Sequence, residues 1–461
     1  MTYRLLVILA WSLGVLFLQA APRPDILVYL SDDHSQFDSS LYGDPSIQTP
    51  ELEKLADDGM TFTHAFIASP SCAPSRGAML TGLMPARNGA EDNHSYPREG
   101  IPSLIERFNH LGYQTVAFGK VAHGRGGGDF GFQKMDRKSA YQGLKTTTTQ
   151  FLKNRKDKRP LCLFVGISNP HVPWPMKNDV DPAKVTFPPH HIDTPSTREH
   201  RAAYMQEIHE LDHFMGELRG LAARHLGKDH IFLHTSDHGS QWPFGKWTLY
   251  DYGTRVPFIV SWPGVIESGT RTDAMVSWVD ILPTLLDAVG EETPKNLDGR
   301  SFLPVLKGEK KHHRERIFVT HTGDKGVNVY PSRSVRTEDW KLIWNPHTEF
   351  AFTTHSDLYR KVGAGAYWTE WVALSKKDAA ARAILDRYYQ RPEWELYHVG
   401  KDRWEFKNLS GDPAQSKRLV GLKKELQEWM KKQGDTIPVL NEPRLLSEPS
   451  RWSPDVDLRK D

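Results

Sequence analysis

Short apolar runs alternate with amphipathic segments along the first two thirds of the chain. Runs rich in β-branched and aromatic residues predict four buried strands, at residues 25–31, 113–119, 161–168 and 231–236. Between them, apolar residues recur at helical spacing and predict helices over residues 49–59, 101–112 and 196–222. This alternation is typical of an α/β fold in which a large, mostly parallel sheet is flanked by helices.

Local signals mark the ends of two of these helices. Thr49 has the character of an N-cap before Pro50, which suits the first helical position, and Gly59 is the expected stop. Farther along, Ser196 and Glu199 have the spacing of a capping box. The longest predicted helix therefore begins directly after Ser196.

The later chain changes character at a highly charged stretch. Beyond it, residues 332–345 are predicted to form a hairpin of short strands, and residues 414–432 an amphipathic helix. We therefore expect a larger α/β domain over residues 22–308 and a smaller C-terminal α+β subdomain, with a small antiparallel sheet and a helix, over residues 309–461.

The first residues have the order of a cleavable secretory signal. One arginine precedes an apolar run from Leu5 to Leu18, and small residues follow at Ala20 and Ala21. An anchoring transmembrane helix is the alternative, but the apolar run is short for a membrane span. We expect a signal peptide over residues 1–21, export to a periplasmic, secreted or lysosome-like compartment depending on the host, and no stable membrane insertion after cleavage.

Composition narrows the classes of partner. The chain has 461 residues with 59 Lys and Arg against 57 Asp and Glu, so no overall field favours nucleic acid, and specificity has to come from a local site. Only two cysteines are present, which excludes a disulfide-rich scaffold. A Cys72–Cys162 bridge is one explanation of the pair. The other is that Cys162, in an apolar strand-like run, is an ordinary buried thiol, which leaves Cys72 unexplained.

Polar side chains follow each of the four predicted strands. They are Asp32 and Asp33, Lys120 with His123, His171, and Asp237 with His238. Because ligands bind outside the carboxyl ends of the strands in parallel α/β sheets, we expect these groups to share one site. Three neighbouring carboxylates repel one another unless a cation holds them, although each aspartate taken singly could be a helix or turn cap. The oxygen-rich set suits Ca²⁺ or Mg²⁺ and His238 suits a transition metal, so the residues alone leave the metal open.

Cationic and proton-carrying side chains are dense around the same blocks. They are Arg76, Lys120, His123, His171 and Lys246. Together with a metal they describe a pocket for an anion with several oxygens, such as sulfate or phosphate. Each residue taken alone is more often a surface charge or a structural histidine, so the prediction rests on the set.

Cys72 lies just before a predicted helix that has Pro74 in its first turn and Gly82 as its stop, where backbone N–H groups favour an anion or a thiolate. A cysteine-phosphatase interpretation fails, because Ala78 stands where such a site needs its arginine. The stretch "CAPSR" instead resembles the Cys-x-Pro-x-Arg signature of the type I sulfatases, members of the alkaline phosphatase-like superfamily. The likeness continues through "GAMLTG".

The resemblance extends over nearly all of the chain after residue 22, in blocks such as "DILVYLSDD", "GYQTVAFGK", "NPHVPW", "SDHG" and "GTRVPFIVSWPG". It implies an alkaline phosphatase-like fold and a modifying enzyme that oxidises Cys72 to formylglycine. It further implies one Ca²⁺ ion held by Asp32, Asp33, Asp237, His238 and residue 72. The sulfate would be surrounded by Arg76, Lys120, His123, His171 and Lys246.

The family chemistry assigns a role to each of these groups. One hydroxyl of the hydrated formylglycine attacks sulfur to give a covalent sulfo-enzyme intermediate, and the other then loses its proton so that the aldehyde reforms and sulfate leaves. By this correspondence Ca²⁺ and Arg76 activate the nucleophile, Lys120 and Lys246 clamp sulfate oxygens, and either His171 or His123 protonates the leaving group. Three tryptophans near the site are candidates for stacking on sugar rings, with core packing as the alternative: Trp174, Trp242 and Trp247.

Within the family, residues 328–345 and 388–413 look most like heparan N-sulfatases (sulfamidases, N-sulfoglucosamine sulfohydrolases). Sulfamidases, however, usually carry Asn in place of His238, Arg near Lys246, and Lys-x-His in place of Lys120-x-x-His123. The "GKVAH" and "DH" elements look instead like iduronate 2-sulfatases. The expected substrate is therefore a sulfated sugar of heparan-type glycosaminoglycan.

Three alternatives to an N-sulfatase stay open. One is an O-sulfatase of the iduronate 2-sulfatase type, and the second is a phosphonate or phosphate ester hydrolase on the same scaffold. The third is a binder of sulfated glycans in which Cys72 is never modified.

Overall fold

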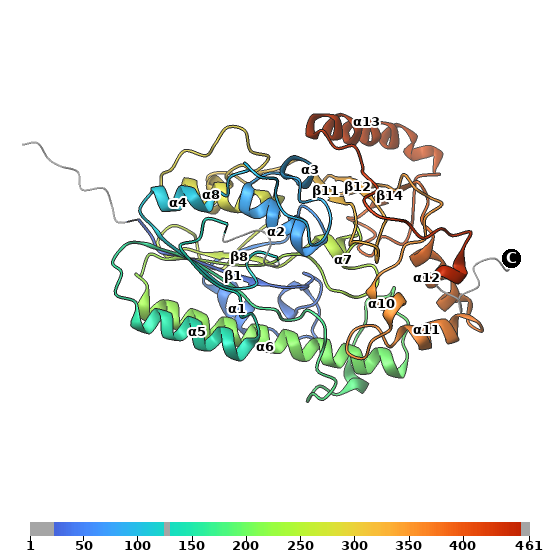
Figure 1. Ribbon diagram of the computed structural model, residues 1–461, viewed down its shortest axis with the longest axis horizontal. Coiled ribbons are helices and arrows are strands. Elements are labelled where there is room, and N and C mark those ends of the chain that lie inside the picture. The colour runs from blue at the N-terminus through green and yellow to red at the C-terminus, as the bar shows by residue number, and fades with distance from the viewer. Residues whose placement is uncertain (1–22, 124–129, 453–461) are drawn as a thin grey trace, which may run out of the picture.

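A large sheet lies between two layers of helices, and a smaller sheet stands beside it (Figure 1). This computed structural model describes residues 23–123 and 130–452, so the signal peptide predicted for residues 1–21 lies outside the described residues. The predicted fold class is confirmed: a mostly parallel sheet flanked by helices, with a C-terminal α+β part. Among the described residues, no helix is both long and apolar enough to cross a membrane.

The large sheet has the strand order β5-β4-β6-β1-β7-β8-β2-β9, in which only β8 runs antiparallel to its neighbours. Its three central strands are buried along their whole length, which explains their continuous apolar runs. The strands are β1 (Ile26–Ser31), β2 (Met60–Phe62), β4 (Gln114–Gly119), β5 (Lys134–Asp136), β6 (Leu161–Gly166), β7 (Ile231–Ser236), β8 (Phe258–Ser261) and β9 (Thr270–Thr272). The four predicted strands are all present, with ends within two residues of the prediction.

The pairing register of the central strands β6, β1 and β7 brings their ends level with one another. Ile26 of β1 pairs with Cys162 of β6 on one side and with Ile231 of β7 on the other. The three strands therefore end level with one another. The residues that follow them come out at one edge of the sheet, which is what a shared site requires.

Helices cover both faces of the sheet (Figure 1). One layer consists of α1 (Pro50–Asp57), α5 (Tyr141–Asn154) and α6 (Pro195–His225). The opposite layer consists of α2 (Cys72–Thr81), α3 (Pro85–Asn88), α4 (Ile105–His110) and α8 (Ile281–Ala288). Short elements complete this part of the chain: α7 (Asp251–Thr254), α9 (Leu303–Leu306) and a two-stranded sheet of β3 (Ala65–Phe66) and β10 (Val276–Ser277).

The start of the longest helix corrects a prediction. α6 begins at Pro195, and its N-cap is Thr194, whose hydroxyl accepts the backbone N–H of Thr197 at 3.2 Å. The capping box predicted from Ser196 and Glu199 is therefore wrong. Proline suits the first helical position because its ring presets φ and no backbone hydrogen bond is lost there, so the helix starts two residues earlier than predicted.

The helix predicted over residues 101–112 is also shorter than expected. Only Ile105–His110 is helical in α4. The backbone N–H of Leu104 donates to the carbonyl of Leu80 at 2.8 Å, which ties the preceding residues to α2 instead of to a helical turn.

The C-terminal part is an antiparallel sheet in the order β11-β12-β13-β14, with α13 (Ser416–Gln433) packed on it. Its strands are β11 (Ile317–His321), β12 (Ser332–Arg336), β13 (Trp340–Trp344) and β14 (Trp394–His398). Between β13 and β14 lie α10 (His355–Tyr359), α11 (Trp368–Ser375) and α12 (Ala379–Tyr389). The predicted hairpin and amphipathic helix are confirmed. The division at residue 308 stays a prediction, because one hydrophobic core runs through both parts.

A buried ion pair fastens the end of α13 to this sheet. The Arg333 guanidinium donates from Nη2 to Asp435 Oδ1 at 2.7 Å and from Nη1 to the His321 carbonyl at 2.6 Å. The side chains of Arg333 and Asp435 are 1% and 0% exposed. Each charge is therefore away from water and depends on the other for its compensation.

Replacing Arg333→Met should therefore lower the free energy of unfolding by about 3–5 kcal/mol, because Asp435 is left as a buried, unpaired carboxylate. Urea denaturation measures the change. Arg451→Met is the matched control, since Arg451 pairs with Glu442 at 2.7 Å but is 52% exposed, and it should have little effect. Equal losses in the two variants would contradict this account.

Candidate active site

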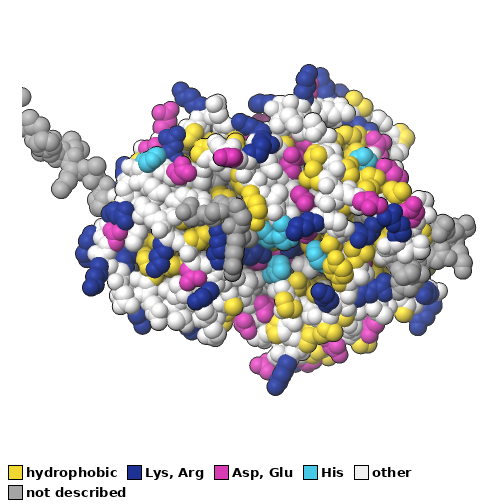
Figure 2. All heavy atoms as spheres, in the orientation of Figure 1, with side chains coloured by type: hydrophobic (Ala, Val, Ile, Leu, Met, Phe, Trp, Pro, Cys, Tyr) yellow, Lys and Arg dark blue, Asp and Glu magenta, His cyan; other side chains and the backbone are white. Residues whose placement is uncertain are grey.

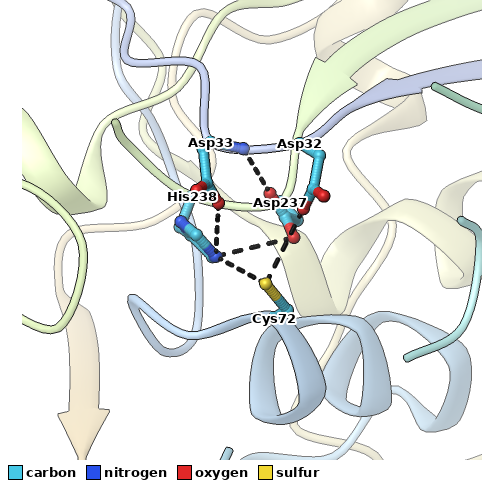
Figure 3. A group of neighbouring side chains, drawn as sticks. All are labelled: Asp32, Asp33, Cys72, Asp237 and His238. Carbon is cyan, nitrogen blue, oxygen red and sulfur yellow. Dashed lines mark hydrogen bonds and ion pairs between the residues drawn. The ribbon is translucent and has the colours of Figure 1, made fainter. Parts of the chain in front are cut away.

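The residues predicted to follow β1, β4, β6 and β7 meet at one edge of the large sheet. Figure 3 shows Asp32 and Asp33 after β1, Asp237 and His238 after β7, and Cys72 at the start of α2, with their side chains pointing toward one another. One ligand atom from each of the five lies within 4.8 Å of the others, and all five side chains are buried.

The distances within this cluster are short. His238 Nε2 lies 3.2 Å from Cys72 Sγ, 3.4 Å from Asp33 Oδ1 and 3.6 Å from Asp237 Oδ2. Three carboxylates, a thiol and an imidazole at this spacing form a donor set that fits a divalent cation. The oxygen-rich composition fits a hard ion such as Ca²⁺.

Three cationic side chains balance the buried carboxylates. Arg76 lies with Nη2 3.2 Å from Asp32 Oδ1 and Nε 3.0 Å from Asp237 Oδ2. Lys246 Nζ lies 3.0 Å from Asp33 Oδ1, and Lys120 Nζ forms an ion pair with Asp32. The Arg76 and Lys246 side chains are 1% and 2% exposed, so the positive charges are held rigidly beside the carboxylates.

Burial and the neighbouring charges together set the pKa values of the aspartates and of His238. Burial alone raises the pKa of Asp32, but Lys120, His171 and Arg76 outweigh it and hold that pKa well below its usual range. For Asp33, burial dominates and raises the pKa although Lys246 opposes it. Burial lowers the pKa of His238, but Asp237, Cys72 and Asp33 outweigh it and raise the pKa to about 9. The cluster is therefore held together by charge complementarity.

The two cysteines lie in opposite environments. Burial raises the pKa of the Cys72 thiol, yet Lys120 and Lys246 outweigh it, so the pKa is lowered and the thiolate is favoured. Cys162 lies within β6, where burial raises its thiol pKa. Both cysteines are free, so the Cys72–Cys162 bridge considered from the sequence is not formed. Cys162 is the ordinary buried thiol of the alternative interpretation.

Local structure holds Cys72 in place. It is the first residue of α2, a helix that is buried at every position and ends at Gly82 in the left-handed conformation, as predicted. Ser75 donates its hydroxyl to the Asp237 carbonyl at 2.6 Å, and the Ala73 N–H donates to Asn93 Oδ1 at 3.2 Å. The Cys-x-Pro-x-Arg stretch is thus anchored to β7 and to a neighbouring loop.

The two candidate histidines border the cluster. His171 Nδ1 donates to the Val172 carbonyl at 2.6 Å, and its Nε2 lies 4.0 Å from Asp33 Oδ2. His123 Nε2 lies 2.7 Å from Nδ1 of His94. Burial, reinforced by Lys120, lowers the pKa of His171 to about 4 and that of His123 to about 3. Figure 2 shows histidine side chains gathered near the centre of the face it presents.

Sequence reasoning missed a supporting network around Asp324, which follows β11. Its carboxylate accepts hydrogen bonds from Asn93 Nδ2 at 2.9 Å and Trp247 Nε1 at 3.0 Å, and it lies 3.6 Å from His94 Nε2. These residues sit in loops far apart in the sequence. The one local signal was that Asn93 and His94 follow closely behind the Cys72 block.

The tryptophans considered as sugar platforms lie in the core. Trp174 and Trp242 are 2% and 1% exposed and stack on each other with ring centroids 4.8 Å apart. Trp247 is 3% exposed and bonded to Asp324. Of the two interpretations left open by the sequence, their burial supports core packing for all three.

The donor set predicts a measurable response to Ca²⁺. Adding Ca²⁺ to EDTA-treated, desalted protein should raise the thermal unfolding temperature, because a ligand at a hundred times its dissociation constant stabilises the folded state by about 2.7 kcal/mol. Differential scanning fluorimetry measures the shift. Asp237→Asn should lose most of it, whereas Asp181→Asn, at a side chain 52% exposed, should keep it. A full shift in Asp237→Asn would refute the donor set.

Comparisons with known proteins agree with this geometry. Residues 24–291 match the family model described as Sulfatase, and residues 238–357 match the model described as N-sulphoglucosamine sulphohydrolase, C-terminal.

Individual relatives match over most of their length. An N-sulphoglucosamine sulphohydrolase of Homo sapiens is 29% identical over 468 residues, covering 89% of this chain and 90% of the relative. An ulvan-active sulfatase of Formosa agariphila is 29% identical over 426 residues, covering 90% of this chain and 81% of the relative. A solved structure described as a complex with its substrate D-glucosamine-2-N,6-O-disulfate superposes with a TM-score of 0.69 at 20% identity, covering 91% of this chain and all of the other.

Proposed function

The chain belongs to the sulfatase family, and from that premise we propose that this hydrolase of sulfate esters or sulfamides removes the N-linked sulfate of glucosamine in a heparan-type glycosaminoglycan. The observation that carries the choice of N-sulfate is the match of residues 238–357 to the C-terminal model of N-sulphoglucosamine sulphohydrolase. That stretch supplies both Lys246 and Asp324 to the candidate site.

Position 72 is the proposed nucleophile. The Cys-x-Pro-x-Arg stretch supports conversion of Cys72 to formylglycine by a formylglycine-generating or equivalent enzyme of the host, coupled to export and completed before the chain folds, since Cys72 is 1% exposed in the folded protein. Its place at the start of a buried helix, beside three cationic side chains, suits a nucleophile. Once modified, residue 72 would supply a hydroxyl that attacks sulfur, and a Ca²⁺ ion would supply Lewis acidity. Asp32, Asp33, Asp237 and His238 are the residues that would hold the ion.

The three cations of the site are proposed to bind the sulfate. Lys120 Nζ lies 3.5 Å from Cys72 Sγ, and Arg76 and Lys246 are held by carboxylates of the same cluster. Positive groups that are already in place when charge develops on the sulfate oxygens stabilise the transition state without reorganisation. Their carboxylate partners therefore serve the reaction by holding them still.

His171 is the proposed acid that protonates the leaving group. Its Nδ1–H is committed to the Val172 carbonyl, and because the pKa of His171 is lowered to about 4 the resting ring is neutral, with no proton on Nε2. The negative charge of a bound sulfate group would raise that pKa, so Nε2, on the side of the cluster, is the nitrogen that would take up the transferable proton when substrate binds. The Nε2 atom of His123 is instead engaged by His94. We assign to His123 a contact with the substrate or sulfate that His94 and Asp324 orient.

An O-sulfatase of the iduronate 2-sulfatase type is the second candidate. His238 favours it, because this imidazole contacts Cys72 and Asp33 directly where sulfamidases usually carry Asn. The Lys120-x-x-His123 spacing favours it as well. Both candidates share the nucleophile and the cations, so only the bond cleaved separates them.

A substrate panel tests the function. Inorganic sulfate release from N-sulfoglucosamine should exceed release from a 2-O-sulfated uronate, and an aryl phosphonate ester should be turned over least. Cys72→Ala should lower kcat at least about a thousand-fold, because the nucleophile is lost. A preference for the uronate would select the second candidate, and a preference for the phosphonate would refute a sulfatase. Full turnover by Cys72→Ala would refute the covalent mechanism.

Leaving-group dependence tests the histidine assignment. His171→Ala should lower kcat on a sugar sulfate by about a hundredfold or more, and far less on 4-nitrophenyl sulfate, whose leaving group departs without a proton. His123→Ala should lower both rates by similar factors. Equal losses on the two substrates in His171→Ala would contradict its role as the acid.

A further inference from the structure

A second concentration of positive charge lies away from the candidate active site. A groove of about 380 Å³ opens beside the outer strands of the large sheet, where β2 and β9 face the turn between β12 and β13. None of the residues proposed above for metal or sulfate binding lines it. Its cationic and imidazole lining comes from separate segments: His64, Arg255, Arg271, Arg336 and Arg403.

The two inner arginines have partners in the protein. Arg336 Nη1 donates to both oxygens of Asp251, at 2.9 and 2.8 Å, and Arg255 Nε donates to the Thr63 carbonyl at 2.7 Å. Asp251 also lies 3.8 Å from Arg255 Nη1 and pairs with Lys341, which has Glu405 as a second partner at 2.7 Å. One carboxylate is therefore left for two inner guanidiniums. These contacts hold the inner guanidiniums in place but leave the groove positively charged.

The two outer arginines have no such partner. Among the residues that the structure describes, neither the Arg271 nor the Arg403 side chain forms a hydrogen bond or an ion pair, although the backbone of Arg271 pairs with β2. Arg271 stacks over Tyr42 at 5.7 Å and Arg403 over Phe37 at 4.4 Å, contacts that leave the N–H groups of both side chains available. The acidic lining consists of Glu338 and Asp339 in an exposed turn, and neither is within ion-pair distance of these arginines.

A buried N–H donor of Arg336 that lacks an acceptor also indicates that the groove can accommodate an anion. Arg336 is 3% exposed, and its Nε has no hydrogen-bond partner in the described part of the chain. Burial together with the neighbouring Arg336 and Arg403 lowers the pKa of Arg255 to about 10, although Asp251 opposes it. Burial with Arg255 and Arg336 lowers the pKa of His64 to about 3. Asp251 acts on both inner arginines, and Asp44 and Asp38 act on Arg403, so the positive charge of the groove is balanced only in part.

We propose that this groove is a second oxyanion site, which binds a sulfate or phosphate group either as the free ion or carried on a saccharide. Guanidinium groups present paired N–H donors in the geometry that such anions accept, and four of them surround one cavity here. The anion accepts from Arg271 and Arg403 and balances the inner pair. The proposal requires only an oxyanion and is independent of the bond that the active site cleaves.

Equilibrium dialysis tests the proposed oxyanion site. Labelled inorganic sulfate and, in a separate experiment, labelled phosphate are dialysed against the protein at constant ionic strength. The wild-type chain should bind one more equivalent than the double variant Arg271→Gln/Arg403→Gln, which alters only the outer, unpartnered side chains. Lys184→Gln/Lys424→Gln removes the same charge at side chains 84% and 76% exposed and should bind as the wild type does. Equal stoichiometry in all three proteins would overturn the proposal.

Steady-state kinetics separates the two sources of the anion. If the groove holds a saccharide-borne sulfate, the arginine double variant should raise KM for a sulfated oligosaccharide several-fold and leave KM for a monosaccharide sulfate unchanged. If it holds the free ion, neither KM changes although an equivalent of bound sulfate is lost. In both cases kcat on the monosaccharide stays at the wild-type value, so failure of this site is distinguishable from failure of the catalytic assignment.

Discussion

The structure depends on a buried balance of charge at the carboxyl edge of the large sheet. Asp32, Asp33 and Asp237 are excluded from water, and each meets a cation from another segment. Buried charges of this kind cost several kcal/mol each unless they are paired, so the segments that carry them are held to one arrangement. The backbone shows the same constraint, since Asp33 and Trp247 have φ of 68° and 67°, a left-handed conformation that costs non-glycine residues on the order of 1–3 kcal/mol.

The C-terminal part completes this site instead of merely covering it. Asp324 reaches from the loop after β11 to Asn93, His94 and Trp247, which adjoin the Cys72 stretch, His123 and Lys246. Through Asn93 it also steadies the first turn of α2. One hydrophobic core runs through both parts of the chain, and Asp324 is buried beside it. Residues around the candidate site are thus positioned by a single aspartate that lies 231 positions from Asn93 and 77 positions from Trp247 along the chain.

Short-range patterns in the sequence were enough to predict the central strands and the polar residues that follow them. Buried parallel strands need continuous apolar runs, and their ends bring Asp32, Lys120, His171 and Asp237 to one edge, so both the sheet and the candidate site could be predicted. The start of α6 was misplaced, because two capping signals overlap and Pro195 settles the competition. The Asp324 network and the arginine groove could not be found, since both arise from loops brought together only by tertiary packing.

The proposed chemistry depends above all on residue 72 acting as a modified side chain within the charge cluster. Mass analysis of the peptide containing Cys72, taken from protein purified from its native host, tests it most directly. The account predicts an aldehyde, trapped by a hydrazide reagent, in place of the thiol, in a fraction that tracks specific activity across preparations. A fully active preparation whose Cys72 peptide carries only an unmodified thiol would contradict it.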